Sequence, residues 1–101
     1  MAEAKKTVVV IEDEPGVIDL VRLILERKGL KFVGALTGRE GLETVRRVKP
    51  SLILLDLMLP NMDGWQVYQQ IKADPELGHI PIKVITAKSQ SIDDVLRRYM
   101  S

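Results

Sequence analysis

Short runs of apolar, mostly β-branched residues alternate along the chain with stretches in which apolar side chains recur at helical spacing. The apolar runs predict strands at Thr7–Ile11, Lys31–Leu36, Ser51–Leu55 and Ile82–Thr86. The helical stretches extend from Pro15 to Gly29 and over Gly38–Lys49, Gly64–Ala73 and Ser91–Met100. Strands that alternate with helices are typical of a parallel sheet whose neighbours are joined by crossover helices. The sequence therefore predicts a doubly wound α/β fold, β-α-β-α-β-α-β-α, in one domain over residues 1–101.

The composition of the runs indicates where two of them lie in the sheet. Leu52–Leu55 is apolar without interruption, which is typical of a central strand that is buried on both faces. Gly34 interrupts the second run and indicates an edge strand. Because strand–helix–strand connections are right-handed, the carboxyl ends of all the strands lie on one side of the sheet. Polar residues at those ends should therefore converge, at the place where open α/β sheets bind ligands.

Carboxylates follow two of the predicted strands. Glu12 and Asp13 come directly after the first strand, and Asp56 comes directly after Leu55. Carboxylates this close raise one another's pKa unless a cation lies between them. Mg²⁺ suits such a site, since it binds few protein carboxylates, keeps several waters and often shares a phosphate with the protein. One of the carboxylates would then be free to act as a nucleophile, whereas Glu14 is interpreted as a charge favoured by the start of the next helix.

Further residues are expected to contribute uncharged oxygens or space beside this acidic cluster. Thr86 ends the fourth predicted strand, and its hydroxyl could donate to an oxygen of a phosphoryl group on Asp56. The small side chain of Ala87 leaves space for such a group. Met58 would contribute through its backbone carbonyl, because a thioether is a poor ligand for a hard ion.

These segments resemble the receiver domain of two-component response regulators, the family typified by the chemotaxis response regulator. The matching stretches are Val10–Pro15, Asp56–Trp65, Ile80–Pro81 and Ile85–Ala87. The resemblance runs in register over nearly the whole chain. It implies a flavodoxin-like receiver fold and a phosphorylation switch rather than an enzyme.

The same resemblance implies a role for each site residue. Asp56 would be the phosphoacceptor, which receives its phosphoryl group from a histidine kinase or a phosphotransfer protein. Mg²⁺ would be held by Glu12, Asp13, Asp56 and the backbone carbonyl of Met58. Thr86, with Ala87 beside it, would contact the phosphoryl group and couple it to the surface around the fourth strand and the helix that follows.

The chain departs from the family pattern after Thr86. Family members continue with a fifth strand and helix, and a Lys-Pro pair at the end of that strand supplies a lysine to the phosphoryl group. No such lysine is found here, because Lys88 lies on the wrong element and the sequence ends at Ser101. We therefore expect a receiver domain that is incomplete at its C-terminus, with Lys83 marking an edge strand. Exposed apolar surface should then favour self-association, as a dimer or by strand exchange.

Three alternatives differ in what they require of the sequence. A truncated or degenerate receiver could self-associate as a scaffold without efficient signalling. A flavodoxin-like nucleotide binder would need a phosphate loop rich in serine, threonine and glycine where Glu12–Pro15 carries negative charge. A metal-dependent phosphohydrolase would typically have a second acid at the position of Met58. The receiver interpretation agrees best with the residues present.

The composition of the chain limits the possible partners and the cellular location. The 15 basic and 14 acidic side chains give a net charge of +1, so nucleic-acid binding by this chain is not expected. The absence of cysteine excludes disulfides and thiolate metal sites, and it fits a reducing compartment. No apolar stretch reaches the roughly 20 residues that cross a bilayer. We expect a cytoplasmic protein that does not bind membranes.

Overall fold

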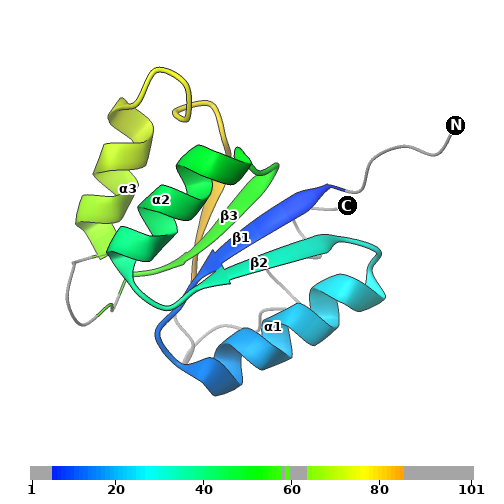
Figure 1. Ribbon diagram of the computed structural model, residues 1–101. Coiled ribbons are helices and arrows are strands. Elements are labelled where there is room, and N and C mark those ends of the chain that lie inside the picture. The colour runs from blue at the N-terminus through cyan, green and yellow to red at the C-terminus, as the bar shows by residue number, and fades with distance from the viewer. Residues whose placement is uncertain (1–5, 58, 60–63, 86–101) are drawn as a thin grey trace, which may run out of the picture.

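The computed structural model describes residues 6–57, 59 and 64–85, which form a parallel four-stranded sheet with helices on both faces (Figure 1). In chain order the elements are β1 (Thr7–Ile11), α1 (Pro15–Arg27), β2 (Lys31–Ala35), α2 (Gly38–Val48), β3 (Leu52–Asp56), α3 (Gly64–Ala73) and β4 (Ile82–Ile85). The strand order is β2-β1-β3-β4, so β1 and β3 are central. The predicted doubly wound, flavodoxin-like fold is confirmed.

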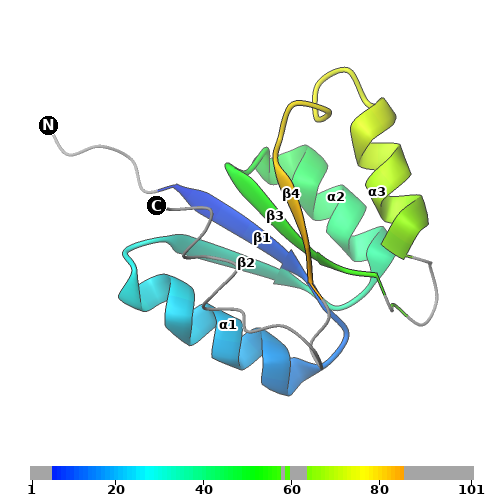
Figure 2. The same ribbon diagram turned by 180° about the vertical axis from the view of Figure 1, so that it is seen from behind.

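Two apolar layers hold the helices against the sheet. α1 covers one face, and α2 with α3 covers the other (Figure 2). Alternate side chains of β1 serve the two layers: Val9 and Ile11 pack with α2 and α3, while Val8 and Val10 pack with α1. Every residue of β3 is buried, as expected for a strand covered on both faces. The carboxyl ends of the two central strands are thus fixed by the most buried part of the molecule.

The end of α1 shows how the sequence sets one helix boundary. Gly29 has a φ of 77°, a conformation in which a residue without a side chain avoids strain. Its N–H donates to the carbonyl of Glu26 at 3.0 Å, and the N–H of Leu30 donates to the carbonyl of Leu25 at 2.9 Å. These two bonds form a Schellman ending. They end α1 and turn the chain directly into β2.

The observed bounds differ from the predicted ones by a residue or two at several ends. β2 ends at Ala35 rather than Leu36, and β3 begins one residue late but includes Asp56, because Asp56 pairs with Ile85 of β4. Hydrogen-bond pairing, not hydrophobicity, decides that last position. The bounds of α3 are those predicted. The predicted helix Ser91–Met100 lies outside the described residues.

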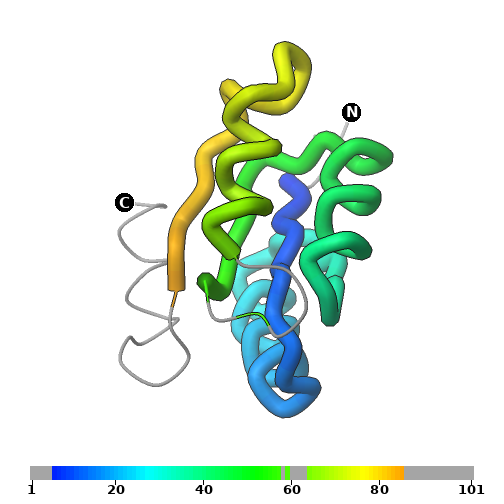
Figure 3. Tube along the Cα trace, turned by 90° about the vertical axis from the view of Figure 1, so that its left-hand side faces the viewer, coloured from blue at the N-terminus to red at the C-terminus, as the bar shows by residue number. Residues whose placement is uncertain are grey.

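β4 lies at the margin of the described sheet, beside β3 (Figure 3). Its Lys83 is in register with Leu54 and is exposed, on the face that α1 covers, whereas Ile82 packs with the opposite layer. Within the described ranges, no helix combines the length and the apolar character that crossing a membrane requires.

Candidate functional site

Strand register brings the predicted acidic residues together. β1 and β3 are parallel neighbours with Ile11 opposite Leu55, so Glu12 and Asp56 are the next residues along the same ladder. The N–H of Glu12 also donates to the carbonyl of Ala35 in β2 at 3.0 Å, which keeps the end of β1 in the sheet. The relative position of the two carboxylates is therefore set by the backbone hydrogen bonds of the central strands.

Glu12, Asp13 and Asp56 form a compact oxygen cluster. Each offers a carboxylate oxygen, and these oxygens all lie within 4.8 Å of one another. Glu12 is 1% exposed and Asp56 is 5% exposed, whereas Asp13 is half-buried and gives the cluster its contact with solvent. A few oxygen ligands with one open side suit a hard divalent cation that keeps part of its water shell. The predicted convergence of these three acids is confirmed.

The ionisation of Glu12 is strongly perturbed by its surroundings. Its pKa is raised from 4.5 to about 8, first by burial and then by the nearby carboxylates of Asp56 and Asp13, while a backbone hydrogen bond from Glu14 opposes the shift. That bond runs from the N–H of Glu14 to Oε1 of Glu12 at 3.1 Å. Among the described residues, the buried Oε2 atom of Glu12 has no hydrogen-bond partner. A cation in the cluster would satisfy Oε2 and favour the ionised carboxylate, so the donor set fits Mg²⁺.

The backbone after Asp56 is held where β3 leaves the sheet. The carbonyl of Leu57 accepts a hydrogen bond from the N–H of Gly64 at 3.2 Å, which joins the exit of β3 to the first residue of α3. The side chain of Leu59 is buried in the layer beneath α2 and α3, and Leu57 packs against the same layer. The strand bearing Asp56 is therefore braced against α3 as well as against β1.

Several predicted site residues lie outside the described part of the chain: Met58, Thr86 and Ala87. The backbone ligand and the switch contact accordingly stay predictions. Two contributors near the acids were not predicted, namely the N–H of Glu14 on Glu12 and the close packing of Gly64 on the chain after Asp56. Both depend on backbone atoms, and residue types alone do not show where backbone atoms lie.

Sequence comparison matches residues 8–100 to the family described as the response regulator receiver domain. The chain is 37% identical over 91 residues to the alkaline phosphatase synthesis transcriptional regulatory protein PhoP of Bacillus subtilis (strain 168), covering 90% of this chain and 37% of that protein. It is 33% identical over 96 residues to the DNA-binding response regulator MtrA of Mycolicibacterium smegmatis (strain ATCC 700084 / mc(2)155), covering 95% of this chain and 41% of that protein. The chain thus spans less than half the length of both relatives.

Solved structures agree with these matches. The N-terminal domain of a response regulator receiver protein from Methanoculleus marisnigri JR1 superimposes with a TM-score of 0.80 at 34% identity, covering 95% of this chain and 78% of that one. The phosphorylated cyanobacterial phytochrome response regulator RcpA gives a TM-score of 0.77 at 33% identity, covering 96% and 75%. Fold, acidic cluster and sequence lead to the same assignment: this chain belongs to the response regulator receiver domain family of two-component signalling.

Proposed function

We propose that this receiver domain takes a phosphoryl group onto Asp56, from a histidine kinase or a phosphotransfer protein, with Mg²⁺ as cofactor. The observation that carries the proposal is the cluster of Glu12, Asp13 and Asp56, whose oxygens lie within 4.8 Å of one another at the ends of two central strands. In this proposal, Glu12, Asp13, Asp56 and the backbone carbonyl of Met58 would hold Mg²⁺. Thr86, with Ala87 beside it, contacts the transferred group.

The transfer requires little chemistry from the protein. An oxygen of the Asp56 carboxylate attacks the phosphorus of the donor phosphohistidine, and the new O–P bond forms as the P–N bond breaks. The bonding pair returns to the imidazole nitrogen, so no further reactant is needed. When bound, Mg²⁺ would neutralise charge on the phosphoryl oxygens in the transition state. Glu12 and Asp13 would hold that ion, and Glu12 would give up its proton to do so.

The domain in this proposal is a switch that accepts a group, rather than an enzyme that turns over substrate. Its location is proposed to be cytoplasmic, as expected for a chain without cysteine. Relatives such as MtrA are named as DNA-binding regulators, a description of those longer proteins. The net charge of +1 supports the proposal that this chain does not itself contact nucleic acid.

The phosphoacceptor role is tested by incubating the chain with a small-molecule phosphodonor and Mg²⁺ and measuring intact mass. The wild type should gain the mass of one phosphoryl group, and Asp56→Asn should gain none, because the amide is not a nucleophile for phosphorus. A second sample containing a chelator controls for the metal. Incorporation that persists in Asp56→Asn, or its absence from the wild type with Mg²⁺, would overturn the assignment.

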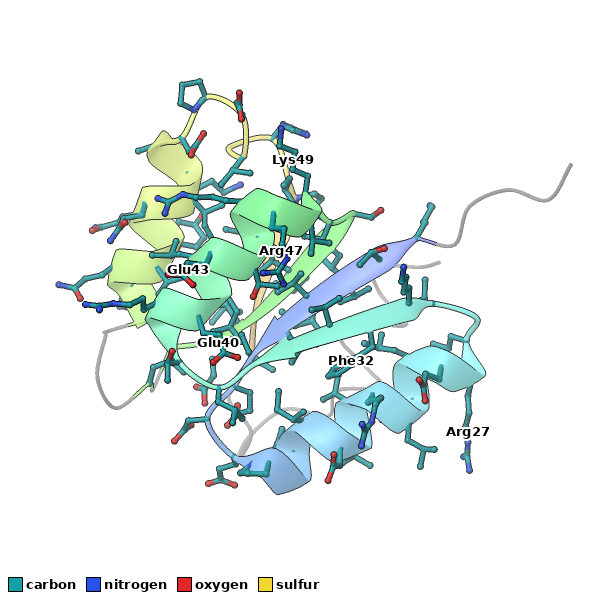
Figure 4. The ribbon with its side chains drawn as sticks, in the orientation of Figure 1. Arg27, Phe32, Glu40, Glu43, Arg47 and Lys49 are labelled. Carbon is teal, nitrogen blue, oxygen red and sulfur yellow. The ribbon has the colours of Figure 1, made fainter. Side chains whose placement is uncertain are left out.

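We also propose that the chain self-associates, which is the property on which the alternative scaffold function depends. The support is the outer surface of α1, where Leu20 is 53% exposed and Leu23 is 49% exposed. The outer surface of α2 is different, since its projecting side chains include Glu40, Glu43 and Arg47 (Figure 4). Of these two helices, α1 is therefore the better candidate for an apolar contact.

A further inference from the structure

Gly64, the first residue of α3, lies unusually close to the backbone that follows Asp56. A Cβ atom built on Gly64 would overlap the Cα of Leu57, and it would be 2.6 Å from the carbonyl oxygen of Asp56 and 2.9 Å from the carbonyl carbon of Leu57. The N–H of Gly64 donates to the carbonyl oxygen of Leu57 at 3.2 Å. The start of α3 therefore rests directly on the peptide group that carries the candidate phosphoacceptor out of β3.

Glycine is needed at position 64 because there is no room for a side chain, and not because of an unusual backbone conformation. Among the described glycines, only Gly29 has a positive φ, so alanine at position 64 would have an ordinary backbone. At Gly41 the nearest atoms to a built Cβ belong to the side chain of Ile11, which can change rotamer. At Gly64 they belong to the main chain of Asp56 and Leu57. A side chain at Gly64 would force either α3 or the segment after Asp56 to move.

Such a movement would act on the acidic cluster. Asp56 is both the last residue of β3 and one of the three acids, and its peptide bond to Leu57 is the group that Gly64 approaches. Groups that bind an ion or a reacting group need to be held within about 0.5 Å of the productive geometry by their support. The packing of α3 on the Asp56–Leu57 peptide provides support of this kind from outside the sheet.

We propose that Gly64 is a positioning residue for the metal site: its lack of a side chain lets α3 brace the Asp56–Leu57 peptide so that the carboxylate of Asp56 stays at binding distance from the cation. This inference rests on the Mg²⁺ site of the proposed function. It assigns to the α3 terminus a role in metal affinity that is separable from its contribution to stability.

The test compares Gly64→Ala with a matched control at the other end of the α3 region, Gly78→Ala. A Cβ on Gly78 would lie 2.8 Å from the carbonyl oxygen of Lys72 and 3.2 Å from that of Asp74, so it also strains main-chain contacts, but far along the chain from the acids. Mg²⁺ affinity is measured by isothermal titration calorimetry on folded protein, and stability by urea unfolding in a chelator. Both variants should be less stable than the wild type.

Only Gly64→Ala should lose Mg²⁺ affinity, by about tenfold or more, which is the usual effect of disturbing residues that orient metal ligands. Gly78→Ala should bind Mg²⁺ as the wild type does. Equal Mg²⁺ affinity in Gly64→Ala and the wild type would overturn the proposal, and so would an equal loss in both variants. If Gly64→Ala does not fold, the proposal is tested by the rate of amide hydrogen exchange at Gly64 in the wild type, measured with and without Mg²⁺. Mg²⁺ should slow that exchange because binding and bracing are coupled, and an unchanged rate would overturn the proposal.

The outcomes separate this inference from the phosphoacceptor role. If the wild type binds Mg²⁺ and Gly64→Ala binds it weakly, Gly64 positions the site even where phosphodonors fail to label Asp56. If labelling of Asp56 succeeds and Gly64→Ala keeps full Mg²⁺ affinity, the phosphoacceptor role stands and the positioning role falls. A wild type that binds no Mg²⁺ would overturn both.

Discussion

At the level of single residues, Glu12 and Asp56 are both almost completely buried, yet they contribute differently. Glu12 has a buried oxygen without a hydrogen-bond partner among the described residues and a pKa raised to about 8. Near neutral pH and without a cation, it is therefore held mainly as a neutral acid. Asp56, at the end of the neighbouring strand, faces this group across the ladder. The protonation state of Glu12 thus sets how much negative charge lies beside the other two acids of the cluster.

Glu12→Gln should change how stability depends on pH. A carboxyl whose folded pKa of about 8 lies above its unfolded value of 4.5 contributes stability that is complete below pH 4.5 and is lost as the pH rises through 8. Glutamine has a similar shape and does not titrate. In a chelator, the urea midpoint of the wild type should therefore fall, relative to that of Glu12→Gln, between about pH 5 and about pH 9. Parallel pH profiles for the two proteins would contradict the raised pKa.

At the level of elements, the hydrogen bonds at helix ends fix how the strands follow one another. α2 begins after Thr37, whose Oγ1 atom accepts a hydrogen bond from the N–H of Glu40 at 3.1 Å. Its buried residues Leu42 and Val45 pack on the sheet, and Pro50 follows the helix before β3 begins. The cap therefore sets where α2 starts between β2 and β3.

Thr37→Ala should destabilise the protein by about 1 kcal/mol, the typical effect of removing a helix N-cap. Thr37→Ser keeps an oxygen at the same position and should recover most of that loss. Thermal or urea unfolding of the three proteins measures the differences. Similar destabilisation by alanine and serine would show that the hydroxyl is not the group that matters.

The sequence predicted the elements better than their contacts. α3 was predicted with its observed bounds because apolar positions recur at helical spacing between clear breakers, and β3 was placed centrally because it is apolar on both faces. The three acids were predicted to meet because strand ends in a parallel sheet lie together. A raised pKa was expected for carboxylates this close, but its location on the buried Glu12 and the packing of Gly64 were not predicted, since both depend on burial and distances that no residue pattern encodes.

At the level of the whole molecule, the described surface is apolar in one notable place. Leu20 and Leu23 lie one turn apart on α1, and each has about half of its surface exposed. The two other exposed large apolar residues among those described lie elsewhere: Leu36 between β2 and α2, and Trp65 on α3. An apolar contact between copies would therefore centre on α1.

Replacing Leu20 and Leu23 together by serine should reduce self-association, because it removes the apolar surface that a second copy would cover. Light scattering over a range of concentrations measures the molecular mass of the wild type and the variant. Leu36→Ser is a suitable control, since Leu36 is 42% exposed but lies outside α1. A wild type that is monomeric at every concentration would contradict the proposed self-association.

The parallel pairing of β1 with β3 also determines when the acidic cluster forms during folding. Val8 of β1 pairs with Leu52 of β3, and the whole of α1, β2 and α2 lies between them in the chain. Contacts between residues so distant in sequence form slowly, because a long loop must close before any pairing energy is gained. A chain emerging from the ribosome carries Glu12 and Asp13 well before Asp56 exists. The acidic cluster is consequently a late product of folding, and no fragment that ends before β3 could contain it.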